Sequence, residues 1–434
     1  MTDTVSARAA VVSTTIPQQI DLVYRDILEE LRANGYAVHL VTSRGPHTAR
    51  LEARVHRIHT VPMQRQISLL SDVACFVAWL RLLRTIRPEL VLAGSPKASL
   101  LALSAARLIG VRRRAYLLQG LRLEGTTGAT RRLLAAAERL ASGCADVVIA
   151  VSPSLAKLYQ RLGLAGSTPV RVPAGGSSHG VDAAYFHPMA ADESVRRGLG
   201  LDASVPTLCF IGRLTADKGL PTLAQGLRRL ATEGLAVQLL VLGKQDERDS
   251  QGMLELLRGT GTLVRDVEHV PDVRPYLSLS DALVLPTRRE GLPNVVLEAA
   301  AMQIPSITTD ATGAVDSVVH GETGYVARMD DAADFAAGIR LLLTDQTIRR
   351  QMGVAARARA VEQFEPRAVA RAIVGLAMGE SAPVPGKHRS ARPGSAAELL
   401  EQGQLKQHRT ADAEVRAVPV RQLPAHTGVP SDRR

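Results

Sequence analysis

Residues 282–316 constrain the fold of this chain most, because they read as a buried strand, a polar loop and a helix in immediate succession. The apolar run at 282–285 is typical of a strand buried on both faces of a parallel sheet. The loop after it contains glycine and proline, and an alanine-rich helix begins near Asn294. Such an arrangement forms the edge at which open α/β sheets bind ligands. We therefore expect a phosphate-bearing ligand there.

The same alternation of apolar runs and helical segments occurs twice along the chain. Strands are expected at 9–14, 36–42, 90–93, 116–118 and 145–151, and again at 207–211, 237–242, 263–270 and 282–285. The residues between the two series, 171–188, are rich in Gly, Ser and Pro and read as a connection. This pattern predicts an α/β protein with two doubly wound, Rossmann-like domains.

Composition excludes some functions and leaves others open. The chain has 434 residues, 46% of them apolar, so it can bury a large core. Its net charge of +11 suits nucleic acid or an anionic membrane surface, but aromatic residues are only 3%, which argues against binding single strands by base stacking. A basic nucleic-acid-binding protein is thus a remote alternative, and we expect no nucleic acid partner.

The apolar segment 67–83 contains the only tryptophan, Trp79, and is flanked by arginines such as Arg65 and Arg84. It can be interpreted as an ordinary core helix or as a helix lying in a membrane interface.

Three isolated cysteines fit a reducing compartment, and the N-terminal segment has no apolar core typical of a signal peptide. No apolar run reaches the length needed to span a bilayer. We expect a cytoplasmic protein that associates peripherally with the cytoplasmic face of the membrane.

Three motifs in the second half resemble family 4 retaining glycosyltransferases of the two-domain GT-B fold. They are GRL-x3-KG at 212–219, the Glu290-x7-Glu298 pair within EGLPNVVLEAAA, and GVD-x3-F-x-P at 180–188. In the first half, SPKASLLALSAARLIGV and GLRLEG resemble the branch that builds capsular polysaccharide, exopolysaccharide and lipid-linked oligosaccharide.

The resemblance implies two domains that face each other across a cleft, at 1–185 and 186–365. The helix at 366–380 is implied to cross back to the first domain. Beyond it, residues 381–434 are rich in Pro, Gly, Ser and charge, which predicts a disordered tail.

The resemblance also assigns roles to residues. Arg213 and Lys218 match the pair that binds the diphosphate of a nucleotide sugar, and Glu298 matches the glutamate that accepts hydrogen bonds from ribose. Glu290 matches the glutamate near the donor sugar, so Arg213, Lys218 and Glu290 are the predicted catalytic residues. The remaining predicted contacts to the donor are Gly212, Gly291, Leu292, Asn294 and Val295, and those to acceptor or donor are Gln119 and Lys97.

Two departures from the family pattern concern these roles. Gln119 stands where several relatives have a histidine, and glutamine cannot act as an acid or base near neutral pH. His179 stands where the family usually has asparagine in the segment that connects the two domains, and we interpret it as part of this linker, residues 171–188.

No Asp-x-Asp motif or metal-ligand spacing is present in the part of the sequence expected to fold, so we expect no metal and no cofactor. Cationic side chains and a helix N-terminus would compensate the charge of the leaving diphosphate.

The function implied is transfer of a hexosyl or N-acetylhexosaminyl group, with retention, from a nucleotide sugar, most often a UDP-sugar, to a lipid-linked or polysaccharide acceptor. Two alternatives keep the fold: a transferase with a small soluble acceptor, and a sugar-nucleotide epimerase.

Overall fold

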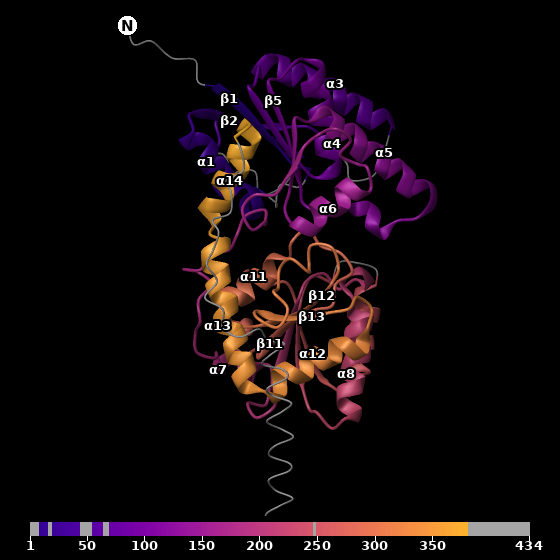
Figure 1. The fold of residues 1–434 in the computed structure, drawn as a ribbon, viewed down its shortest axis with the longest axis vertical. Helices are drawn as coiled ribbons and strands as arrows, with labels where there is room; N and C mark the ends of the chain where they lie inside the picture. Colours follow the sequence, from indigo (N-terminus) through magenta and orange to yellow (C-terminus); the bar gives the residue numbers. More distant parts are fainter. Residues whose placement is uncertain (1–7, 16–19, 44–53, 64–68, 246–248, 381–434) are drawn as a thin grey trace, which may run out of the picture. The chain divides into compact units, whose positions relative to one another are not determined.

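The computed structural model describes residues 8–15, 20–43, 54–63, 69–245 and 249–380. Within them the strands form two parallel sheets, ordered β3-β2-β1-β4-β5-β6-β7 and β10-β9-β8-β11-β12-β13 (Figure 1). In each sheet the chain winds outward in both directions from a central strand, as in doubly wound folds. The predicted α/β architecture of two Rossmann-like domains is confirmed. The tail predicted at 381–434 lies outside the described residues.

The inner strands of the first sheet are apolar runs buried on both faces, as β4 is along its whole length. Its strands are β1 (Arg8–Ser13), β2 (Tyr36–Thr42), β3 (Arg57–Thr60), β4 (Leu90–Gly94), β5 (Arg113–Leu118), β6 (Val147–Ala150) and β7 (Val170–Arg171). The helices are η1 (Ile20–Tyr24, a π-helical turn), α1 (Arg25–Ala33), α3 (Leu69–Ile86), α4 (Pro96–Leu108), η3 (Arg122–Gly125), α5 (Gly128–Cys144) and α6 (Pro153–Arg161). Helix α6 begins where Ser152 Oγ accepts a hydrogen bond from Leu155 N at 3.4 Å.

The second sheet places the two predicted ligand loops side by side. Its strands are β8 (Thr207–Ile211), β9 (Gln238–Leu242), β10 (Leu263–Val267), β11 (Ala282–Leu285), β12 (Ser306–Thr309) and β13 (Gly324–Ala327). The helices are α7 (Glu193–Gly198), η4 (Ala216–Lys218, a 3-10 turn), α8 (Leu220–Thr232), α9 (Ser250–Arg258), α10 (Arg274–Leu277), α11 (Asn294–Ala301), α12 (Ala332–Thr344), α13 (Gln346–Gln363) and α14 (Pro366–Met378). Strand β11 pairs with β8 in parallel, Ala282 opposite Leu208, so both strands end at one edge of the sheet.

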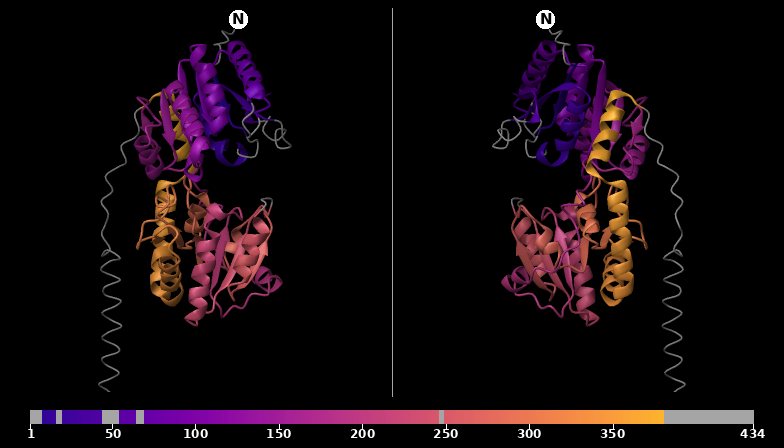
Figure 2. Two further views of the ribbon diagram at one scale, coloured as in Figure 1. Left: turned by 90° about the vertical axis from the view of Figure 1, so that its right-hand side faces the viewer. Right: turned by 90° about the vertical axis from the view of Figure 1, so that its left-hand side faces the viewer.

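The last helix, α14, packs on the first domain, against α1 and the strands β4, β5 and β6. Figure 2 shows α13 beside the second sheet and α14 beside the first. Between α13 and α14 the chain is hydrogen-bonded to residue 181, since Val181 N donates to Phe364 O at 2.8 Å. Phe186 packs against both hydrophobic cores, close to the predicted boundary at 185. The boundaries themselves stay predictions.

Trp79 is fully buried in the core of the first domain, whereas Val73 on the same helix, α3, is 64% exposed. The interpretation of this segment as a core helix is therefore correct for the tryptophan, which cannot serve as an anchor in a membrane interface. Cys75, Cys144 and Cys209 are free and buried. None of the helices among the described residues is both long and apolar enough to cross a bilayer.

Four strands, β3, β7, β12 and β13, were not predicted from the sequence. Each has two to four residues, and none contains a continuous run of four apolar residues such as the one that predicts β11. The strand expected at 263–270 ends at Val267.

Candidate active site

Two loops, 212–219 after β8 and 286–293 after β11, meet at the carboxyl edge of the second sheet. They approach so closely at Gly219 that a Cβ atom there would lie 1.6 Å from Pro286 O, and φ of Gly219 is +74°. Only glycine tolerates both conditions. Gly212, which was predicted to contact the donor, is the first residue of the loop 212–219. Its N donates a hydrogen bond to Leu242 O at 2.9 Å.

Lys218 and Glu290 form an ion pair, Nζ to Oε1, that joins the two loops. Their side chains are only 14% and 16% exposed. The backbone of Glu290 is fixed as well, since its N donates to Thr312 O at 2.8 Å. Because desolvation offsets much of the attraction in such a buried pair, its main effect here is to hold the two charged groups in place.

Arg213 is the more accessible of the two predicted cations, with 52% of its side chain exposed. Its Nη2 lies 3.7 Å from Asp217 Oδ2. An exposed pair of this kind contributes about 0–1 kcal/mol. The Arg213 guanidinium can therefore be reached from solvent by an anionic ligand.

Glu298 lies in the first turns of α11, half-buried, and burial raises the pKa of its carboxyl to about 7. Among the residues that the structure describes, none donates a hydrogen bond to this carboxylate. Its oxygens are not among the fully buried polar atoms, so a ligand can reach them. This carboxylate therefore suits a ligand that brings hydroxyl donors.

The turn that leads into α11 contacts the first domain. A Cβ atom on Gly291 would lie 2.1 Å from Gln119 O, so these two backbones touch. Leu292 is buried, with its Cδ1 3.3 Å from the position that a Cβ atom on Gly176 would take. Val295 packs against the core of the second domain.

Asn294 joins the start of α11 to the linker. Its Nδ2 contacts His179 Nε2 and donates to Gly180 O at 3.2 Å. His179 Nδ1 lies 2.9 Å from Ser178 Oγ. Burial lowers the pKa of His179 to about 4, so the ring is neutral and Nε2 accepts from the Asn294 amide. This arrangement fits the interpretation of His179 as part of the linker.

Gln119 and Lys97 are both held by neighbours in the first domain. Gln119 Nε2 donates to Tyr24 OH at 3.3 Å, and Lys97 Nζ lies 2.7 Å from Asp72 Oδ1. The backbone of Gln119 meets the second loop at Gly291, whereas Lys97 is anchored on α3 through Asp72.

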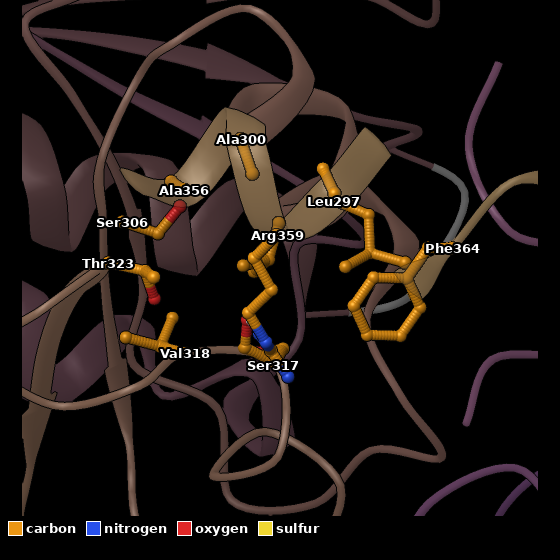
Figure 3. Close-up of a pocket in the computed structure, with 11 residues that line it drawn as sticks. Leu297, Ala300, Ser306, Ser317, Val318, Thr323, Ala356, Arg359 and Phe364 are labelled. Atoms are coloured by element: carbon orange, nitrogen blue, oxygen red, sulfur yellow. The ribbon is translucent and has the colours of Figure 1, made fainter. Parts of the chain in front are cut away.

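A half-buried arginine on α13, Arg359, contacts the segment that carries Thr312. In Figure 3 the Arg359 side chain extends towards Ser317, and the Phe364 ring lies beside it. Arg359 donates to Asp316 O and Ser317 O, both at 2.7 Å. Burial lowers the pKa of Arg359.

The same segment is hydrogen-bonded to the first domain through Ser154. Ser154 N donates to Asp316 Oδ2 at 2.8 Å, and Ser154 Oγ accepts from Gly313 N at 2.7 Å. The loop with Glu290 is thereby linked, through Thr312, to both domains.

Asp217 was not predicted as a site residue. It stands on the loop after β8, and its side chain reaches Arg289 on the loop after β11. It directly precedes Lys218 and is the only carboxylate in GRLTADKG. Its position inside this motif was the one signal in the sequence that could have identified Asp217 as a site residue.

Two Rossmann-like domains with a cationic loop pair at one sheet edge are the arrangement that the resemblance to GT-B glycosyltransferases predicted. A family model described as "Glycosyltransferase Family 4" matches residues 22–175, and one described as "Glycosyl transferases group 1" matches residues 205–345. The capsular polysaccharide biosynthesis glycosyltransferase CapM of Staphylococcus aureus is 31% identical over 360 residues, which cover 82% of this chain and 93% of the relative. The chain belongs to glycosyltransferase family 4.

Solved structures share the fold. A sucrose-phosphate synthase from Thermosynechococcus elongatus superposes with a TM-score of 0.70 at 19% identity, covering 85% of this chain and 98% of that one. Anabaena Alr3699/HepE in complex with UDP-glucose gives a TM-score of 0.69 at 17% identity, with the same coverage of 85% and 98%. These likenesses confirm the predicted GT-B fold.

Replacing Glu298 with Gln is expected to stabilise the unliganded protein at high pH. Below the ordinary carboxyl pKa, both folded and unfolded Glu298 are protonated, and the substitution changes little. As the pH rises from about 4.5 to about 7, only the unfolded state ionises freely, so the wild type loses stability. Above pH 7 the variant should be more stable by about 1–3 kcal/mol.

Urea unfolding at pH 5 and pH 8 measures this difference. Glu255→Gln, on the exposed face of α9, is the matched control and should behave alike at both values. A Glu298→Gln variant that is less stable than wild type at pH 8 would contradict the raised pKa of this carboxyl.

Proposed function

We propose that this enzyme transfers a sugar from a nucleotide sugar, with UDP as the first nucleotide to test, to a hydroxyl of a lipid-linked or polysaccharide acceptor. One observation carries the proposal: two cations, Arg213 and Lys218, lie on the loop that meets the recessed Glu298 helix at one sheet edge. The cations would neutralise the leaving diphosphate. The Glu298 carboxylate would accept hydrogen bonds from the ribose hydroxyls, which supply the donors that it lacks.

Two comparisons support the substrate classes. The name of CapM gives its role as capsular polysaccharide biosynthesis, and Alr3699/HepE binds UDP-glucose. We therefore assign the present enzyme to the synthesis of a cell-surface glycan, as a hexosyl- or N-acetylhexosaminyltransferase.

We further propose that the anomeric configuration is retained and that no divalent metal takes part. In this mechanism the acceptor hydroxyl attacks the face from which the diphosphate leaves, and Arg213 and Lys218 supply the positive charge. Glu290 would act near the donor sugar. NMR of the fresh product reads the anomer directly, and an inverted product would overturn retention. Loss of activity on adding EDTA would overturn the proposal that no divalent metal takes part.

We propose that the reaction takes place at the cytoplasmic face of a membrane, and the surface of the first domain supports contact with a membrane. The neighbouring helices α3, α4 and α5 expose large apolar side chains: Val73, Val77, Leu108, Leu133 and Leu140. Exposed arginines lie on the same helices, among them Arg81, Arg84, Arg107 and Arg132. Apolar and basic side chains together suit an anionic lipid surface.

The double variant Val73→Asp, Val77→Asp should lose binding to vesicles that contain anionic phospholipid. Both side chains are exposed on α3, so the fold should tolerate the change while the charge repels the lipid. Co-sedimentation with anionic and neutral vesicles measures binding. Val354→Asp, at an exposed valine of α13, is the control and should bind as wild type does. Unchanged binding of the double variant would contradict the assignment of this surface.

A nucleotide-sugar panel tests the central proposal by thermal stabilisation. A donor present at 100 times its Kd should stabilise the wild type by about 2.7 kcal/mol. The same donor should give little stabilisation of Arg213→Ala or Lys218→Ala, because each variant removes a cation from the diphosphate. Equal stabilisation of all three proteins would mean that the donor binds elsewhere.

A further inference from the structure

Asp217 joins the two ligand loops through its backbone. Its carbonyl oxygen accepts hydrogen bonds from Arg288 N at 2.9 Å and from Thr287 Oγ1 at 3.3 Å. Both donors lie in the loop after β11, shortly before Glu290. Any shift of Asp217 is therefore transmitted to the loop on which Glu290 stands.

The Asp217 carboxylate lies between two guanidinium groups. Oδ2 accepts from Arg289 Nη2 at 3.0 Å and lies 3.7 Å from Arg213 Nη2. Oδ1 accepts a hydrogen bond from Thr215 Oγ1, which fixes the rotamer. Arg213 belongs to the loop after β8, and Arg289 to the loop after β11. One carboxylate thus accepts a hydrogen bond from Arg289 on one loop and lies within ion-pair distance of Arg213 on the other.

Asp217 remains ionised in this position. Burial alone would raise the pKa of its carboxyl, but the Thr215 hydrogen bond and the charges of Arg289, Arg213 and Lys218 outweigh burial and lower the pKa. Its side chain is 28% exposed.

We infer that Asp217 is a positioning residue that holds the guanidinium groups of Arg213 and Arg289 for the diphosphate of the donor. The inference rests on the proposed function, since it takes a nucleoside diphosphate as the ligand, and it adds Arg289 as a third cation of the site. Two guanidinium groups this close repel each other unless an anion lies between them. The carboxylate keeps both in place before the ligand arrives, so less order is lost on binding.

A role through long-range charge alone would have the opposite effect on affinity. Removing one negative charge near a diphosphate site should tighten binding of the diphosphate. Removing a positioning group should weaken it, because the two arginines are then no longer held. The direction of the change therefore distinguishes positioning from simple electrostatics.

Calorimetric titration of UDP, ADP and GDP, with uridine as the ligand without phosphate, tests the inference in the full-length protein. Asp217→Asn should weaken binding of the preferred diphosphate about tenfold and leave uridine affinity within twofold. Asp217→Ala should weaken diphosphate binding further, because it also removes the acceptor for Thr215. The matched control is Asp330→Asn, which breaks an exposed pair with Arg288 at 2.7 Å on the same loop. It should bind every ligand as wild type does.

Unchanged or tighter diphosphate binding by Asp217→Asn overturns the role of Asp217 and leaves the proposed function standing. Equal losses for uridine and diphosphate also overturn it, since they would show a general disturbance of the pocket. A wild-type protein that binds none of the three diphosphates overturns the proposed function and this role together.

Discussion

The ion pair between Lys218 and Glu290 is the contact on which the geometry of the candidate site depends. It connects the loops that follow β8 and β11, and the parallel pairing of these strands brings both loops to one edge. Taking both charges out of water costs several kcal/mol, so attraction alone does not explain their position. The close approach at Gly219 and the backbone bonds of Asp217 bring the two loops together, and the ion pair then fixes the two side chains between them.

This arrangement gives the unliganded site an internal counter-ion for its cations. Glu290 compensates Lys218, and Asp217 compensates Arg213 and Arg289. Under the proposed function, an arriving diphosphate competes with Glu290 for Lys218, whereas Asp217, in its proposed role, stays paired with the two arginines. Hydrogen bonds from Ser154 and Arg359 hold the adjoining segment 312–317. The site is therefore ordered by contacts from both domains.

The sequence predicted the fold class from its apolar runs, and the resemblance to family 4 glycosyltransferases pointed to the two loops that the structure brings together at the candidate site. It could not predict that Lys218 and Glu290 pair, since 72 residues separate them and only the strand order joins them. Asp217 was missed for the same reason: its partner Arg289 lies on another loop. The sequence also left open whether Trp79 lies in the core or at a membrane interface. Its burial depends on how α3 packs and not on the arginines beside it in the sequence.

The dissociation constant of UDP for Glu290→Gln tests most directly whether Glu290 competes with the diphosphate. Glutamine keeps the shape of the side chain but releases Lys218 from its counter-ion, and UDP carries no sugar for Glu290 to contact. If the ion pair occupies Lys218 in the free enzyme, UDP should bind the variant more tightly than wild type, by up to about tenfold or about 1.4 kcal/mol. Weaker binding, or no change, would show that Glu290 does not compete with the diphosphate for Lys218 and would contradict this account of the unliganded site.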